Sequence, residues 1–313
     1  MAKTILVTGG SGFIGFNFIK HISSPTLNII NVDMLTYASQ KETGPWNYFY
    51  KTDIRNKLNL NKIFSKHKPE IVINFAAESH VDRSIDDSTL FTTTNIIGTQ
   101  QLLDASLETE VKRFVQVSTD EVYGSLALSD NPFTEQHRLK PNSPYSASKA
   151  AADLIVRSYE KTHGMDVVIT RCSNNYGPHQ HTEKFIPKTI TNVLSKKKVP
   201  LYGNGTNVRD WIYVKDHCEG IWLATTKGKK GEIYNFGGNE EFANIDIIKL
   251  IANKIDPSSD NDHYEFVEDR KGHDFRYAID FSKAKKELGW NPKFSFEEGI
   301  EKTIQWYKKN TPA

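Results

Sequence analysis

The fold of this chain is decided near its start, by the stretch Thr4-Ile5-Leu6-Val7-Thr8-Gly9-Gly10-Ser11-Gly12-Phe13-Ile14-Gly15. The first five residues are apolar or β-branched, which is typical of a short buried strand. Gly9, Gly12 and Gly15 follow in the turn, and residues 16–22 continue in a helical pattern. This strand–turn–helix order lets the backbone approach a pyrophosphate and points the N–H groups of a helix N-terminus at it. The stretch therefore predicts a dinucleotide site.

Acidic residues follow the next two predicted segments. Residues 27–32 read as a second strand that ends at Asp33. A carboxylate about twenty positions beyond the glycine-rich turn is the expected partner of a ribose 2′-hydroxyl, and it repels a 2′-phosphate. Asp33 therefore favours NAD over NADP, and the alternative is that it only caps a loop. Asp53 precedes a polar helix at residues 56–66 and is either its N-cap or an adenine contact; it could serve as both.

Strands and helices alternate up to residue 171, and this alternation predicts an α/β fold with a Rossmann-type, doubly wound parallel sheet. We expect an NAD-binding domain at residues 1–171, to which the chain returns at about 208–236. Residues 172–207 and 237–313 are more mixed and are predicted to form a smaller α/β substrate domain.

Several local features are predicted along this path. Helices are expected at residues 92–108, 145–163, 185–194, 245–255, 281–288 and 296–309. A hairpin-like turn is expected at residues 200–205, because Gly203 and Gly205 flank Asn204 between two apolar runs. Asp216 is expected to cap the helix that follows the strand at residues 208–214.

A polar cluster follows the apolar run at residues 114–117, which reads as a buried strand. Ser118, Thr119, Asp120 and Glu121 would then lie at the carboxyl end of that strand, where ligands bind in open α/β sheets. Two adjacent carboxylates are costly to bury unless the site uses them. We interpret Asp120 and Glu121 as an acid/base pair and Thr119 as a hydroxyl donor; the alternative is ordinary turn and N-cap chemistry.

Tyr145 and Lys149 are four residues apart and share one face of the predicted helix at residues 145–163. A lysine ammonium near a phenol favours the phenolate, so we expect Lys149 to lower the pKa of Tyr145. Tyr145 would then act as a base. The alternative is an unrelated pair, since this spacing is common on helices.

The bulk composition narrows the function classes. A net charge of +2 gives no strong field for nucleic acid, and no run of about eighteen apolar residues indicates a membrane span. Cys172 and Cys218, with no signal-peptide layout at the start, favour a reducing, cytoplasmic compartment. His179 and His181 could suggest a metal, but no third ligand stands in a matching frame, so no metal is expected.

The glycine-rich turn, Asp33 and Tyr145-x-x-x-Lys149 together resemble the extended short-chain dehydrogenase/reductase family. Within that family, Thr119-Asp120-Glu121-Val122-Tyr123-Gly124 is similar to the nucleotide-sugar 4,6-dehydratases, and residues 76–84, 173–178, 208–211 and 270–280 agree. This sequence departs from the usual pattern at Met34, at Ser39 and at His181-Thr182.

The resemblance implies tightly held NAD, a nucleotide-sugar substrate and a homodimer built on the helices at residues 92–108 and 145–163. Cofactor contacts are expected from Gly9, Gly12, Phe13, Ile14, Gly15, Asp33, Thr36, Asp53, Ile54, Ala76, Ala77, Ser79, Asn95, Ser118, Tyr145, Lys149 and Cys172. Substrate contacts are expected from Ser79, Thr119, Asn174, Lys184, Arg209, Asn244, Arg270, His273 and Tyr277. Asn95 is expected to hydrogen-bond toward the Ser118 turn, and Arg209 and Arg270 to hold a diphosphate.

The residue set predicts a reaction in three steps. Oxidation of sugar carbon 4 to a ketone makes the hydrogen at carbon 5 acidic. Elimination of the carbon 6 hydroxyl can then follow. The hydride that NAD took from carbon 4 finally returns to carbon 6. The sequence leaves open whether the nucleotide of the substrate carries thymine or uracil, so a UDP-sugar 4,6-dehydratase is one alternative. A nucleotide-sugar 4-epimerase or decarboxylase on the same scaffold is another, and a non-catalytic NAD-binding regulator is a remote one.

Overall fold

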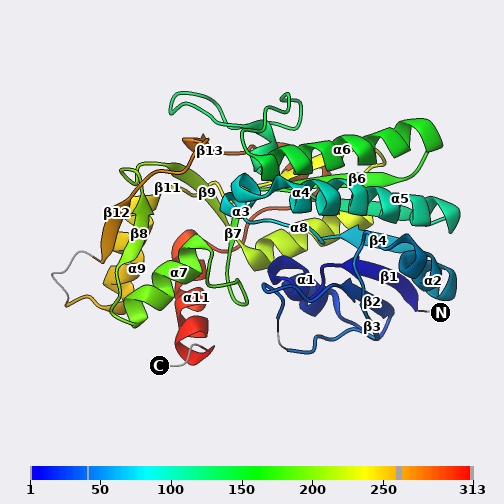
Figure 1. Cartoon of the computed structure of the whole chain (residues 1–313), viewed down its shortest axis with the longest axis horizontal. Helices are drawn as coiled ribbons and strands as arrows, with labels where there is room; N and C mark the ends of the chain where they lie inside the picture. The colour runs from blue at the N-terminus through cyan, green and yellow to red at the C-terminus, as the bar shows by residue number, and fades with distance from the viewer. Residues whose placement is uncertain (1, 41, 259–262, 311–313) are drawn as a thin grey trace.

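The computed structural model describes residues 2–40, 42–258 and 263–310, so the outermost limits of the predicted domains, residues 1 and 313, lie outside the described residues. A seven-stranded sheet in the order β10-β6-β5-β4-β1-β2-β3 forms the larger part (Figure 1). Its strands are β1 (Lys3–Thr8), β2 (Leu27–Asp33), β3 (Tyr48–Lys51), β4 (Ile71–Asn74), β5 (Arg113–Val117), β6 (Val167–Cys172) and β10 (Ile233–Phe236). Every neighbouring pair is parallel. The predicted doubly wound sheet is confirmed.

Helices cover both faces of this sheet because its strands carry apolar residues on both faces. Ile5 and Val7 of β1 pack into one core, with α1 (Phe13–Ile22), α8 (Val214–Lys227) and α10 (Ser282–Leu288). Leu6, between them, points into the opposite core, with α2 (Lys57–His67), α5 (Thr99–Glu108) and α6 (Pro144–His163). The sheet is therefore held rigid between two apolar layers.

The remaining elements form a smaller lobe, on the left in Figure 1. Its four-stranded sheet contains β7 (Asn174–Tyr176), β9 (Val208–Tyr213), β11 (Glu241–Ala243) and β13 (Arg276–Tyr277). A two-stranded sheet pairs β8 (Val199–Tyr202) with β12 (Tyr264–Val267). Its helices are α7 (Phe185–Leu194), α9 (Asn244–Ile255) and α11 (Phe296–Asn310). Trp211 and Tyr176 lie at the centre of this lobe's main core.

Two predicted boundaries in this part of the chain are wrong. The chain returns to the large sheet at α8, because β9 pairs with β7, β11 and β13 and its Trp211 packs in the smaller lobe. It visits the large sheet again at α10, where Trp290 packs edge-on against Phe236 of β10. The hairpin-like turn at residues 200–205 does not join paired strands, because β8 pairs in parallel with the distant β12.

Local predictions around the helices also need correction. The predicted helix at residues 92–108 begins as a π-helical segment, Thr92–Gly98, preceded by α4 (Ser88–Phe91) and followed by α5. Asn56 caps α2 by accepting the N–H of Asn59, so Asp53 is not its N-cap. Asp216 lies inside α8 and accepts the N–H of Phe294 instead of capping.

Two smaller observations complete the frame. Cys172 and Cys218 are both free and buried. Among the described residues, none of the helices is both long enough and apolar enough to cross a membrane.

Candidate active site

A cavity of about 560 Å³ lies at the carboxyl ends of the strands of the large sheet. It opens where β1 is flanked by both β2 and β4, which is the point at which the strand order reverses. The predicted residues that line it are Gly9, Gly12, Phe13, Ile14, Gly15, Asp33, Thr36, Asp53, Ile54, Ala76, Ala77, Ser79, Ser118, Thr119, Asp120, Glu121, Tyr145, Lys149, Cys172, Asn174 and Lys184.

The glycine-rich turn forms one wall of the cavity. Gly9 has a φ of +67°, and a Cβ there would lie 2.7 Å from the backbone nitrogen of Ala76 at the end of β4. Only glycine lets these two strand ends approach so closely. Helix α1 starts at Phe13, at the end of this turn, so the N–H groups of its first turn, which have no partner within the helix, lie at this wall. Asp33 is fixed to the same turn, since its Oδ2 accepts the N–H of Ser11 at 2.9 Å.

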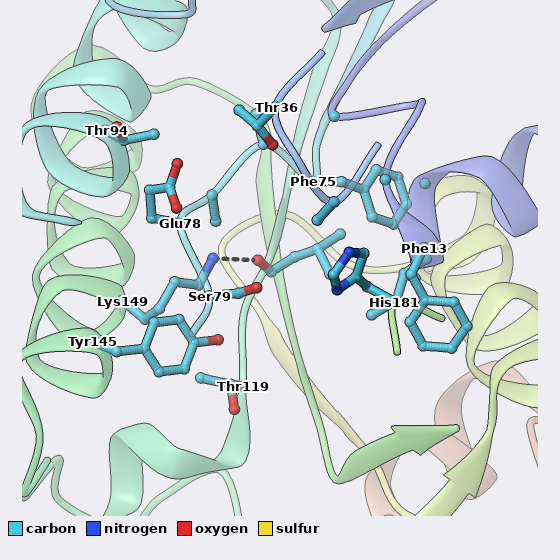
Figure 2. A pocket seen from close by; sticks show the side chains of 18 of the residues that line it. Phe13, Thr36, Phe75, Glu78, Ser79, Thr94, Thr119, Tyr145, Lys149 and His181 are labelled. Carbon is cyan, nitrogen blue, oxygen red and sulfur yellow. Dashed lines mark hydrogen bonds between the residues drawn. The ribbon is translucent and has the colours of Figure 1, made fainter. Parts of the chain in front are cut away.

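Tyr145 and Lys149 face the cavity from the opposite side, on α6 (Figure 2). The start of α6 is fixed by a capping box between Ser143 and Ser146, with Pro144 in the first turn. Lys149 donates from Nζ to the backbone carbonyl of Val117 at 2.7 Å. This bond ties the helix to the end of β5, directly before the Ser118–Glu121 cluster.

The predicted effect of Lys149 on Tyr145 is not what this structure shows. The pKa of Tyr145 is raised well above its usual value, first by burial and then by the charges of Glu121 and Cys172. Burial also lowers the pKa of Lys149, which Asp153 one turn further on partly offsets. The ammonium points at the Val117 carbonyl, so it does not offset the burial of the phenol.

The two carboxylates of the cluster differ in environment. Asp120 has its pKa raised well above the usual range by burial, and then by Glu121 and Asp210. Glu121 also has a raised pKa because of burial, but Lys184, Arg209 and Arg270 oppose the increase. Two titratable groups whose surroundings shift their pKa values apart are suited to act as a general acid and a general base. Asp120 is the better proton donor, and Glu121 the better proton acceptor.

The predicted hydrogen bond from Asn95 toward the Ser118 turn is wrong, because the Asn95 side chain bonds to other groups. The Asn95 amide accepts the N–H of Glu78 at 2.9 Å and donates to Ser148 Oγ at 2.8 Å, and it does not line the cavity. It lies in the π-helical segment, so it braces the Glu78 backbone against α6. Ser118 Oγ is buried in the cavity wall without a hydrogen-bond partner in the described part of the chain.

Five predicted substrate residues lie outside the cavity lining: Arg209, Asn244, Arg270, His273 and Tyr277. The guanidinium of Arg209 donates to the carbonyls of Val208, Asp274 and Phe275 and lies over the Tyr277 ring. Arg270 pairs with Asp82, with 2.5 Å between Nε and Oδ1. His273 contacts Asp269, and Tyr277 donates to Asp274. The helix α9 begins at Asn244.

Several lining residues were not predicted from the sequence. They include Thr52, Arg55, Phe75, Glu78, Thr94, Asn175, Gln180, His181 and Glu183. Glu78 could have been found, because it follows Ala76-Ala77 at the end of β4. Asn175 lies on β7 and Thr94 in the π-helical segment, and the remaining ones come from loops whose path the sequence alone does not define. No group of three or more His, Cys, Asp or Glu side chains within the described ranges is arranged to hold a metal ion.

The parallel sheet, the glycine-rich turn and the Tyr-Lys pair define a dinucleotide-dependent enzyme of the short-chain dehydrogenase/reductase type. Within that class, the chain belongs to the GDP-mannose 4,6-dehydratase family, whose sequence profile matches residues 6–303.

Relatives cover almost the whole chain. It is 46% identical to a dTDP-glucose 4,6-dehydratase of Haemophilus influenzae, over 99% of each protein. A crystal structure of a Streptomyces venezuelae dTDP-glucose 4,6-dehydratase with NAD and TDP bound superposes with a TM-score of 0.92 at 43% identity, covering 98% of this chain and 97% of that one. A UDP-glucose 4-epimerase of Thermotoga maritima superposes with a TM-score of 0.93 at 30% identity, covering 99% and 100%. The fold thus serves both reactions.

Proposed function

We propose that this protein is a dTDP-glucose 4,6-dehydratase, which converts dTDP-glucose to dTDP-4-keto-6-deoxyglucose with NAD as its cofactor. The observation that carries this proposal is the pair Asp120–Glu121, which lines the same cavity as Tyr145 and Lys149. A 4-epimerase needs only an oxidation and its reversal, so it has no use for a second acid/base pair. The dehydratases among the relatives support the same choice over the epimerase fold neighbour.

The residues of the cavity fit NAD. The turn at Gly9 has no side chain, so its backbone N–H groups could bind a pyrophosphate, and the Asp33 carboxylate could accept a hydrogen bond from a ribose hydroxyl. Ser118 Oγ, which has no hydrogen-bond partner in the described part of the chain, could bind a polar group of the cofactor. Bound NAD supplies the hydride acceptor at carbon 4 and the hydride donor at carbon 6. Its positive charge beside Tyr145 would favour the phenolate, which burial alone disfavours in this structure.

The side chains of the site then have separate tasks. Tyr145 takes the proton of the carbon 4 hydroxyl, and Thr119 hydrogen-bonds the same oxygen. Glu121 removes the proton from carbon 5 once carbon 4 is a ketone. Asp120, whose pKa is raised by burial and then by Glu121 and Asp210, delivers a proton to the departing carbon 6 hydroxyl.

The substrate diphosphate is proposed to lie toward Lys184, Arg209 and Arg270. Lys184 lines the cavity, and all three cations are close enough to oppose the raised pKa of Glu121. Because both arginines pair with protein groups in this structure, they would have to exchange partners or share them when substrate binds.

We further propose a homodimer built on α5 and α6. These helices carry exposed Leu107 and Leu154, and Ile97 is exposed in the π-helical segment beside them. Exposed apolar side chains on adjacent helices are typical of a subunit interface. The two free, buried cysteines support a reducing compartment such as the cytoplasm.

One labelling experiment tests the proposed function. Purified protein in heavy water is mixed with unlabelled dTDP-glucose and with dTDP-glucose that carries both deuterium at carbon 4 and ¹³C throughout its sugar, and the product masses are measured by mass spectrometry. The proposal expects loss of one water, transfer of the label from carbon 4 to carbon 6 of the same molecule, and one solvent deuterium at carbon 5. A product of unchanged mass would indicate an epimerase, and loss of carbon dioxide a decarboxylase. Label scrambled between molecules would contradict a retained hydride.

A further inference from the structure

Two loops meet along the rim of the cavity: residues 36–40, after β2, and residues 178–184, after β7. Gln40 donates from Nε2 to the carbonyl of His179 at 2.6 Å, and its Oε1 lies 3.2 Å from Nδ1 of the same histidine. The backbone N–H of Gln40 also donates to the carbonyl of Ser11 in the glycine-rich turn. The first loop is therefore tied both to the turn and to the second loop.

The inner sides of these loops belong to the cavity wall. Thr36 and Ser39 line the cavity from the first loop, and His181 and Lys184 line it from the second. Figure 2 shows Thr36 and His181 at the cavity, across from Tyr145 and Lys149. Tyr37 does not line the cavity; it reaches over to the second loop instead, where its hydroxyl donates to Glu183 Oε1 at 2.9 Å.

Glu183 is the centre of this contact. Its Oε2 lies 3.3 Å from the guanidinium of Arg83 in α3 (Val81–Asp86). The same oxygen lies 3.6 Å from Nε2 of His80, the residue before that helix. His181 Nδ1 lies 3.7 Å from Oε1. The Arg83 guanidinium also lies 3.7 Å above the ring of Tyr37, so the tyrosine is held by its ring and by its hydroxyl. One carboxylate thus joins three segments that are distant in sequence.

We propose that Tyr37, Arg83 and Glu183 form a clasp that keeps the two loops closed over bound NAD and slows its release. The clasp rests on the proposed function for the identity of the cofactor. The proposed function requires the cofactor to be retained, because the hydride taken from carbon 4 must still be bound when carbon 6 is ready to receive it. Burial and the bond to Glu183 raise the pKa of Tyr37, so its hydroxyl remains a donor at neutral pH.

The test measures NAD release in the absence of any sugar. Protein loaded with NAD is diluted into excess fluorescent etheno-NAD, and the exchange rate is followed. Tyr37→Phe removes one hydrogen bond to a charged group, and we expect release to become about tenfold faster. Tyr48→Phe is the matched control, because Tyr48 and Tyr37 are both 44% exposed but Tyr48 lies on β3, where its ring packs against His67 of α2. Its release rate should equal that of the wild type.

A double-mutant cycle shows whether the hydroxyl acts through Glu183. Glu183→Ala should accelerate release at least as much as Tyr37→Phe, and adding Tyr37→Phe to it should change little more. Independent, multiplying effects would overturn the clasp, as would unchanged release in both single variants or faster release in Tyr48→Phe. If Glu183→Ala does not fold, Arg83→Ala replaces it in the cycle. Because no sugar is present, the result stands whether or not dTDP-glucose proves to be the substrate.

Discussion

The two walls of the cavity are built in different ways. On the wall formed by the large sheet, Gly9 and Ala76 bring two neighbouring strand ends close together, so backbone reaches the cavity there. On the side of the smaller lobe, we propose that recognition depends on long cationic side chains, and Arg209 and Arg270 are bonded to protein partners outside the cavity lining.

This difference has a physical origin. A glycine-rich turn has its shape set by the strands that flank it, so its N–H groups are in position before any ligand arrives. A long side chain has many rotamers and takes the partner that best offsets its charge. The sheet wall is therefore preorganised, whereas our proposal requires the lobe wall to exchange protein contacts for substrate contacts. The following experiments compare the two walls.

The largest effect is expected from Tyr145→Phe, on the helix α6 that packs against the large sheet. Loss of the base should slow reduction of bound NAD by dTDP-glucose about 10²–10⁴-fold, because no other group on α6 can take the carbon 4 hydroxyl proton. NAD content after gel filtration should not change. Rapid-scan absorbance near 340 nm measures the step. Tyr159→Phe, on the same helix with its hydroxyl bonded to Asp104, is the control and should behave as wild type.

The next effect separates the tasks of Asp120 and Glu121, the two carboxylates that follow β5. Glu121→Gln should still oxidise carbon 4 but stall before elimination, so NADH and a 4-keto sugar accumulate. Asp120→Asn should oxidise at the normal rate and eliminate about 10²–10⁴-fold more slowly, since an amide does not deliver a proton. Quenched samples analysed by mass spectrometry distinguish the two. If Glu121→Gln releases dehydrated product at the wild-type rate, Glu121 is not the carbon 5 base.

At the lobe wall, the partner exchange predicts opposite effects from two neighbours in one ion pair. Arg270→Ala should raise KM for dTDP-glucose about 10–100-fold, the usual range for a lost charged hydrogen bond. Asp82→Asn should lower KM, because Arg270 no longer has to leave a carboxylate to bind a diphosphate. Steady-state kinetics with Arg138→Ala, an exposed arginine, as control would measure both. An unchanged or higher KM in Asp82→Asn would show that Arg270 does not exchange partners.

The smallest effect concerns His217 of α8, whose Nδ1 lies 2.9 Å from Oδ1 of the cavity residue Asn175. Burial lowers the pKa of His217 from 6.5 to about 3. Between those two pH values, the His217 imidazole is therefore protonated in the unfolded chain but neutral in the folded chain. The contribution of His217 to the free energy of unfolding is therefore fully present above pH 6.5. It decreases by about 1.4 kcal/mol per pH unit as the pH falls below that value.

Urea unfolding between pH 7 and pH 4 measures that slope. His217→Gln should flatten it, whereas His163→Gln, at an exposed position at the end of α6, should leave it unchanged. Equal slopes in wild type and His217→Gln would mean that His217 does not carry the pH dependence.

The same contrast explains what could be read from the sequence. The glycine-rich turn and the run at residues 114–121 are local patterns, so the sheet wall, Asp33 and the cluster up to Glu121 could be located in advance. The positions of Arg209 and Arg270 depend on Asp274 and Asp82, which are 65 and 188 residues away. No local pattern encodes such pairings, and the clasp around Glu183 was missed for the same reason.

Other contacts, some within the same loop and some from distant segments, also overrode several residue-type signals. Asp53 has the residue type of an N-cap, but Arg55 binds its carboxylate and Asn56 takes the cap. Asp216 likewise resembles a cap, but it is needed to hold the backbone of Phe294. Residues 282–290 follow the smaller lobe in sequence, yet the apolar surface of β10 and α8 draws them back to the large sheet.

The π-helical segment Thr92–Gly98 affects how this chain can change in length over evolutionary time. Deleting one residue from α6 before Lys149 would rotate the ammonium by about 100° around the helix axis, away from the cavity. A π-helix closes its hydrogen-bonded turn with one residue more than an α-helix. A single deletion here can therefore be absorbed by a return to α-helical winding, with α4 and α5 keeping their packing faces. The cost would be the position of Asn95 and its brace between Glu78 and α6.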